Sequence, residues 1–172
     1  VRAAIVTAIG NGIAVVIPAG NGGEEFDSTN IKDSGAIMVA AGRMPPGAEV
    51  PAAAAAPIYL GRKSNNNTNF GARIDCHAHG ENVVTAAAKT GQAYFKEFGG
   101  SSSAAAIVAG AAVLIQSIAR QLEQAPLTPA ALRELLRDPE LNTRSQDPAS
   151  DKIACMPNLA RILEKRFGPP PA

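Results

Sequence analysis

The chain has 172 residues, a length that fits one domain or part of a larger one, since domains usually hold about 100–150 residues. Its 16 lysines and arginines offset 15 aspartates and glutamates, so there is no charged field to indicate a nucleic acid or a membrane surface as partner. Hydrophobic residues reach 46% but aromatic residues only 4%, so Ala and Val must supply much of the core. Cys76 and Cys155 are too few and too far apart for a disulfide scaffold or a tetrahedral zinc site.

The first third of the chain predicts a helix followed by two strands. Residues 1–9 have small and apolar residues at helical spacing and stop at Gly10-Asn11-Gly12. The β-branched run at 13–17 is typical of a strand covered on both faces in a parallel sheet. It breaks at the loop 18–23, and open α/β sheets bind their ligands at such carboxyl ends of strands. A second strand is expected at 36–41.

The remainder alternates loops with short elements and one long helix. The composition of 42–69 predicts a long surface loop, and short strands are expected at 73–78 and 82–85. A helix is predicted from about Ser102 to about Leu122, with its apolar front half buried all round. Short amphipathic helices are expected at 128–137 and 157–166, before a frayed tail at 168–172.

No membrane segment is predicted. The longest apolar stretch, 104–115, has twelve residues, whereas a bilayer span needs roughly 20. The chain starts at Val1 without the basic and apolar leader of a signal peptide, and we expect further residues upstream of it.

The segment GGSSSA at 99–104 places serines at a glycine turn where the long helix begins. Backbone N–H groups are unpaired at a helix start and the helix dipole favours a developing negative charge, which suits a nucleophilic serine. The same residues also suit a serine that only caps the helix. The motif alone does not decide between these two interpretations.

Four segments together resemble the subtilisin-like serine peptidases (subtilases). GGSSSAAAIVAG resembles the nucleophile segment of that family, in which Gly-Thr-Ser-x-Ala-x-Pro precedes Val-Ala-Gly. GIAVVIPAGNGG resembles the strand and loop that end in Ala-Gly-Asn, and SGAIMVAA the following core strand. NFGARIDCHAHGENVVT, and beyond it TPAALRELLRD and DKIACMPNLARIL, resemble later parts of the domain. Counting back from Val108-Ala109-Gly110 by the spacing of the family makes Ser102 the nucleophile, and the loop assigns the oxyanion-hole amide to Asn21.

The resemblance implies a three-layer α/β fold with a mostly parallel sheet, of which residues 1–172 are the C-terminal part. It implies an endopeptidase that forms an acyl-enzyme on Ser102. The Asp and His of the triad would lie on an upstream segment, so the chain alone should be nearly inert. The pocket for the residue before the cleaved bond would be lined by Pro18, Ala19, Gly20, Gly99 and Gly100. Secretion or a periplasmic location is also implied.

Two other functions remain open at this stage. Pro18, Ser101, Ala106 and Ile107 depart from the pattern of the family, which leaves room for a catalytically inactive homologue that acts as a protein-binding scaffold. A nucleotide-binding α/β domain is the weaker alternative, because the loop after the first strand lacks the spaced glycine fingerprint.

Metal and histidine chemistry are not favoured by the sequence. His77 and His79 could bind a metal or act as a base, but their register gives no reason to face Ser102, and we expect a structural role. Calcium is common in the family, yet no loop dense in Asp at alternate positions is present and no site is assigned. Cys76 and Cys155 are expected to be small buried hydrophobes.

Overall fold

The computed structural model describes residues 1–27, 29–45, 60–62, 68–87, 91, 93–123 and 125–168. Most of the predicted loop 42–69, and the predicted tail beyond residue 168, lie outside the described residues. The helices are α1 (Arg2–Gly10), α2 (Ser101–Glu123), α3 (Pro129–Arg137), α4 (Pro148–Asp151) and α5 (Leu159–Phe167). The strands are β1 (Val16–Pro18), β2 (Ile37–Arg43), β3 (Gly61–Arg62), β4 (Cys76–His79), β5 (Val83–Ala86), β6 (Tyr94–Phe98), β7 (Thr143–Arg144) and β8 (Cys155–Met156).

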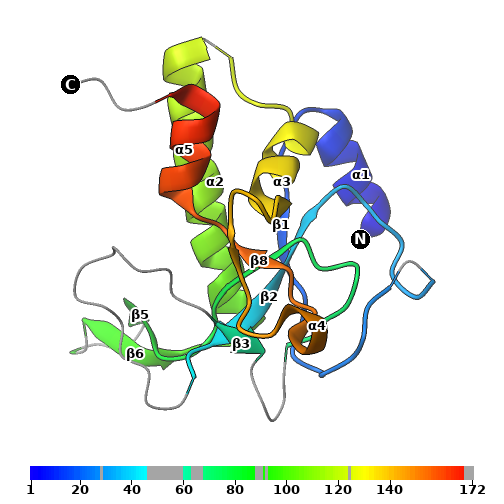
Figure 1. The fold of residues 1–172 in the computed structure, drawn as a ribbon, viewed down its shortest axis with the longest axis vertical. Coiled ribbons are helices and arrows are strands. Elements are labelled where there is room, and N and C mark those ends of the chain that lie inside the picture. Colours follow the sequence, from blue (N-terminus) through cyan, green and yellow to red (C-terminus); the bar gives the residue numbers. More distant parts are fainter. Residues whose placement is uncertain are drawn as a thin grey trace.

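A mostly parallel sheet forms the centre of the fold (Figure 1). Its order is β1-β2-β4-β8-β7, in which β1, β2, β4 and β8 run parallel and β7 is antiparallel to β8. The short β3 pairs antiparallel with β2. Strands β5 and β6 form a separate antiparallel hairpin that leads directly into α2. The predicted class, mixed α/β with a mostly parallel sheet, is confirmed.

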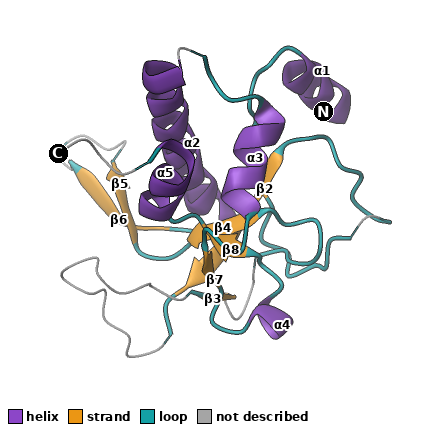
Figure 2. Ribbon diagram, turned by 45° about the horizontal axis from the view of Figure 1, so that its top comes forward, coloured by secondary structure: helices purple, strands orange, loops and turns teal. Residues whose placement is uncertain are grey.

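One face of the sheet carries the main core, beneath the helices α2, α3 and α5 (Figure 2). Val39, Cys76 and Ala78 of the central strands pack there against Val108 and Ile115 of α2. A second, smaller core lies on the other face, where Met38 and Ala40 meet partly buried loop residues. The alternation of neighbouring strand residues between two cores is the period-two pattern of a sheet covered on both sides.

The predicted helix ends agree with the capping groups in the structure. Thr128 accepts a hydrogen bond from the Ala131 N–H at the start of α3, with Pro129 in the first turn. Asn158 accepts one from the Arg161 N–H at the start of α5. Each cap satisfies an N–H that has no partner inside its helix.

The prediction that the front half of α2 is buried all round is wrong. Ala104, Val108 and Ile115 are buried against the sheet, whereas Ile107, Val113 and Leu114 on the other side are exposed. The physical reason is that the described residues cover the helix only where it faces the sheet and the helices α3 and α5. The predicted strand 13–17 is likewise shorter and less buried, because β1 starts at Val16, includes Pro18 and forms one end of the described sheet order.

Five short elements were not predicted. Strand β3 has only two residues and lies in the segment 42–69 that was predicted to be a loop, so that prediction is wrong at Gly61–Arg62. All residues of β6 are exposed, and its sequence YFKEF lacks the alternation of apolar and polar residues that predicts a half-buried strand. Strands β7 and β8 have two residues each and α4 has four, which is too short for either period to show.

One described segment, Ser101–Leu122 within α2, is long and apolar enough to cross a membrane by length and composition. The same test is passed by the core helix of a soluble protein, and one face of α2 packs against the sheet. The segment therefore carries no argument for a membrane span.

Candidate active site

Two loops meet at the carboxyl end of β1. The first, residues 19–24, leaves the sheet immediately after Pro18, and Gly20 turns it with a φ of +93°, a conformation that favours glycine. The second loop, Gly99-Gly100, leads from β6 into α2. These loops are about 80 residues apart in the chain and hydrogen-bond directly to each other.

Close contacts require glycine at both positions of the second loop, Gly99 and Gly100. A Cβ on Gly99 would lie 2.7 Å from the Gly80 carbonyl oxygen, which is closer than real Cβ contacts. A Cβ on Gly100 would lie 3.0–3.3 Å from the Asn21 amide group, and Gly100 has a φ of +79°. The Gly100 N–H donates to the Gly80 carbonyl at 2.8 Å, which fixes the turn just before the helix begins.

Asn21 is tied to the start of α2 by its side chain. The Ser101 N–H donates to Asn21 Oδ1 at 2.9 Å, and the Gly20 N–H donates to Ser101 Oγ at 3.0 Å. Because Oδ1 is held as the acceptor, the amide NH₂ of Asn21 is turned away from the Ser101 N–H. Among the described residues it has no hydrogen-bond acceptor, and Asn21 is exposed.

The three serines at the start of α2 differ in burial and in their partners. Ser101 is buried and accepts from Gly20, while buried Ser103 directs its hydroxyl to the carbonyl oxygens of Gly100 and His79, at 2.9 and 3.1 Å. Ser102 is exposed, and no described residue hydrogen-bonds its hydroxyl. Its backbone N–H belongs to the first turn of the helix, where such groups have no partner inside the helix. Ser102 is therefore the serine of the three that can react with a ligand in solution.

The predicted pocket residues fall into two groups. Gly20 and Gly100 lie beside Asn21 and Ser101 and take part in the contact between the loops. Ala19 is buried and its N–H donates to the Val39 carbonyl at 2.8 Å, which anchors the loop to the sheet. Pro18 is exposed at the end of β1, and Gly99 packs against Gly80. The backbone of both loops is thus close to Ser102.

Neither histidine is arranged as a base for Ser102. His77 is fully buried, its Nδ1 lies 3.2 Å from the Ile153 carbonyl oxygen, and burial lowers its pKa to about 4. His79 is partly buried, and burial also lowers its pKa. Its side chain lines a hollow with Gly42 and Ile107 rather than the contact between the loops.

In the part of the chain that the structure describes, no metal-binding cluster and no reactive thiol lies near the site. Within the described ranges, no group of three or more His, Cys, Asp or Glu side chains is close enough to hold a metal ion. Cys76 and Cys155 are buried as expected, on register-paired positions of β4 and β8. Burial raises the pKa of both thiols, that of Cys155 to about 11, so neither is a ready nucleophile.

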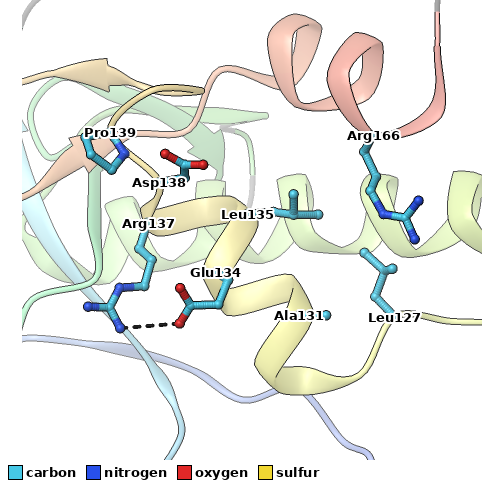
Figure 3. A pocket seen from close by; sticks show the side chains of 8 residues that line it. All are labelled: Leu127, Ala131, Glu134, Leu135, Arg137, Asp138, Pro139 and Arg166. Carbon is cyan, nitrogen blue, oxygen red and sulfur yellow. Dashed lines mark ion pairs between the residues drawn. The ribbon is translucent and has the colours of Figure 1, made fainter.

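A separate surface hollow of about 600 Å³ lies between α3 and α5 (Figure 3). Leu127, Leu135 and Arg166 line it, and Arg137 pairs with Glu134 across 3.5 Å at one side. Its lining residues lie between Leu127 and Pro139 and at Arg166, and none of them belongs to the two loops beside Ser102. The hollow is not part of the candidate site.

The model of the subtilase family matches residues 1–154. The chain belongs to the subtilase family. It is 32% identical over 139 residues to an extracellular protease of Xanthomonas campestris pv. campestris, a match that covers 78% of this chain and 21% of that protein.

Solved subtilase-like structures share the fold at low identity. A lanthipeptide protease superposes with a TM-score of 0.66 at 20% identity, over 95% of this chain and 54% of that one. The PatG macrocyclase in complex with peptide gives 0.63 at 19% identity, over 98% and 47%. A protease of Pseudoalteromonas arctica gives 0.61 at 24% identity, over 95% and 46%. The chain thus spans about a fifth of the curated subtilase relative and about half of these structures.

The subtilase motifs predicted Ser102 and Asn21, but they did not indicate a third polar residue beside the site. Asn69 is buried, and its side chain hydrogen-bonds to three residues of the loop that carries Asn21. In the sequence it lies 45–50 residues from these partners, and the segment NFG was noted only as part of the family pattern. The sequence did not predict that Asn69 is buried, because asparagine is usually found in exposed turns.

Proposed function

We propose that this chain is the nucleophile-bearing part of a subtilisin-like serine endopeptidase. The observation that supports this most is the pairing of the two loops: Asn21, anchored through Oδ1 to the Ser101 N–H, lies at the helix turn that presents Ser102. Membership of the subtilase family supports the same function, as does the protease name of the Xanthomonas relative. The substrate class is a peptide or protein.

The proposed reaction is acyl transfer to water. The Ser102 hydroxyl oxygen attacks the carbonyl carbon of the scissile bond while a base takes its proton. The carbonyl oxygen becomes an oxyanion, which accepts hydrogen bonds from the Asn21 amide NH₂ and the Ser102 N–H. The leaving amine takes the proton as the carbon–nitrogen bond breaks, and water then releases the acyl group from Ser102 by the reverse sequence.

The base and its orienting carboxylate are proposed to come from an upstream segment. Ser102 needs a base, and the two histidines of the chain face other groups. The exposed apolar side of α2 and the terminal position of β1 in the described sheet give such a segment a surface to cover. We call the complex of this chain with an upstream half of a subtilase domain, which carries the Asp and His, the reconstituted enzyme.

An extracytoplasmic location is part of the proposal, because the curated relative is named an extracellular protease. Calcium, which the family resemblance makes possible, is assigned no residues here. The alternative function is a catalytically inactive homologue that binds proteins; the departures at Ser101, Ala106 and Ile107 favour it, but none removes a reacting group.

Labelling with a fluorophosphonate tests the proposed function. In the reconstituted enzyme we expect the probe to label Ser102 and neither Ser101 nor Ser103, which peptide mapping can distinguish. Ser101 and Ser103 are buried and their hydroxyls are engaged, so both are poor nucleophiles. Label on either neighbour, or label that survives Ser102→Ala, would show that the nucleophile is misassigned. An unlabelled parent would favour the binding scaffold.

A further inference from the structure

The buried side chain of Asn69 hydrogen-bonds to the loop that carries Asn21. The Gly22 and Glu24 N–H groups donate to Asn69 Oδ1 at 3.0 and 2.9 Å. Asn69 Nδ2 donates to the Ala19 carbonyl oxygen at 2.9 Å. Four residues, from Ala19 to Gly22, are thereby fixed at both ends around Asn21.

The backbone of Asn69 adds a fourth contact. Its N–H donates to the Gly20 carbonyl oxygen at 3.0 Å, so the residues on both sides of Asn21 bind Asn69. Gly20 and Gly22 also lie against its amide group: a Cβ on Gly20 would be 3.0 Å from Asn69 Nδ2, and one on Gly22 would be 3.3 Å from Oδ1. The loop thus packs closely against the Asn69 side chain.

The chemistry of these contacts requires an amide. One group must donate to a carbonyl oxygen and accept from two N–H groups, which a carboxylate cannot do because it has no donor. The two N–H donors also fix which amide atom is oxygen. Asn69 is buried, so water cannot replace these bonds without a rearrangement of the loop.

We propose that Asn69 is the positioning residue for the oxyanion donor: it holds the loop so that Asn21 stays anchored to Ser101 and keeps its NH₂ directed to the reacting carbonyl. The catalytic part of this inference rests on the proposed function. Asn69 acts through Asn21, so the loss of Asn69 should matter only while Asn21 is present.

A double-mutant cycle in the reconstituted enzyme tests this dependence. Asn69→Ala should lower kcat by about 10-fold or more with KM changed by less than about twofold, because the misplaced donor matters mainly in the transition state. In the Asn21→Ala background the same substitution should change kcat by less than about twofold. Equal losses in both backgrounds would overturn the proposal.

Asn142 provides a matched control. It is also a buried asparagine, whose Nδ2 donates to the Leu135 and Asp138 carbonyls and whose Oδ1 accepts from the Asn158 N–H. Asn142→Ala removes a similar set of hydrogen bonds, none of them to the loop, so it should lower stability and leave kcat within about twofold of the parent. A similar loss of kcat in both alanine variants would reduce Asn69 to a general stabiliser.

Hydrogen exchange separates this inference from the proposed function, because it needs no activity. Asn69→Ala should speed exchange of the Ser101 and Gly20 amide protons by at least about tenfold, since both bonds depend on the loop position. Asn142→Ala should leave both rates unchanged. Unchanged rates in Asn69→Ala would refute the positioning role even if the protein proved to be an inactive homologue.

A second variant covers the case in which Asn69→Ala does not fold. Asn69→Asp keeps an acceptor for Gly22 and Glu24 but loses the donor to Ala19. We expect a smaller fall in kcat than in Asn69→Ala, about threefold to tenfold, that again vanishes in the Asn21→Ala background. A loss that persists in that background would overturn the proposal.

Discussion

Substitution of Asn21 separates its two proposed tasks, anchoring the loop and donating to the oxyanion. In the structure its Oδ1 accepts from the Ser101 N–H, while its NH₂ has no acceptor among the described residues. Asn21→Ala removes both functions. The lost anchor costs about 0.5–1.5 kcal/mol of stability at an exposed site, whereas a lost oxyanion donor costs about 2.7–4 kcal/mol in the transition state. We therefore expect kcat to fall by about 10²–10³ with KM nearly unchanged.

Asn21→Asp is the matched variant, because it removes only the donor. Its carboxylate can still accept from the Ser101 N–H, and a negative charge is stabilising at the start of α2, by about 0.3–1 kcal/mol. The folded protein should be at least as stable as the parent. The oxyanion would now face a carboxylate oxygen instead of an N–H, so kcat should fall by at least about 10².

Steady-state hydrolysis of a chromogenic peptide by the reconstituted enzyme gives kcat and KM separately, and urea unfolding gives stability. The result that would refute the reasoning is an Asn21→Asp enzyme with kcat within about threefold of the parent. Such an enzyme would show that Asn21 serves only as an anchor, since the anchoring oxygen is the one feature it shares with asparagine.

Two further predictions concern buried ionisable side chains. Asp75 is 3% exposed and pairs with Arg73 and Arg133 at 2.9 and 2.8 Å, so Asp75→Asn should lower the free energy of unfolding in urea by about 3–5 kcal/mol. Asp33 binds the same two arginines but is 53% exposed, so Asp33→Asn should lower it by less than about 1 kcal/mol. Equal costs would contradict the role of burial. The buried His77 has its pKa lowered from 6.5 to about 4, so the unfolded chain binds a proton first as pH falls. Stability should drop by about 3 kcal/mol between pH 6.5 and 4, and His77→Gln should remove that drop; an unchanged pH profile in the variant would refute the assignment.

The sequence predicted the elements whose signals are local. The starts of α3 and α5 were predictable because the caps Thr128 and Asn158 act within four residues, with a first-turn proline, Pro129, in α3. Helix α2 was predicted to within one residue at each end, because a glycine turn precedes a long run of small and apolar residues. The prediction that its front half is buried all round was wrong. An apolar pattern indicates that side chains favour burial, but it does not indicate which part of the protein covers them.

A motif predicts the reacting groups of the candidate site, whereas its contacts between distant residues could not be predicted from the sequence. Ser102 and Asn21 follow from the family pattern, and the hydrogen bond between their loops agrees with that register. The contacts of Asn69 join residues 45–50 positions apart, and the Asp75–Arg133 pair spans 58. Such pairs arise from the order of the strands in the sheet, which no local spacing in one sequence reveals.

The last prediction concerns the apolar side of α2. Val113 and Leu114 are 66% and 44% exposed, and Ile107 and Leu122 extend the same uncovered helix toward its two ends. Together with β1 at one end of the described sheet, they form a surface that should drive aggregation unless another segment covers it. Each such side chain contributes about 1.5–3 kcal/mol when fully buried, so two of them can decide whether the segments associate.

We therefore expect the chain alone to aggregate and to hydrolyse no peptide, and to become a soluble complex with the upstream half. The double variant Val113→Lys, Leu114→Lys should stay soluble alone but bind the upstream half at least about 100-fold more weakly, because two charges would have to be buried. Tyr94→Lys is the control: Tyr94 is also 66% exposed, but it lies on the β5–β6 hairpin, and its substitution should leave association unchanged. Light scattering and titration of the two halves measure both effects. A soluble monomer that cleaves peptides unaided, with activity lost in Ser102→Ala, would overturn the need for a companion segment and require a base within this chain.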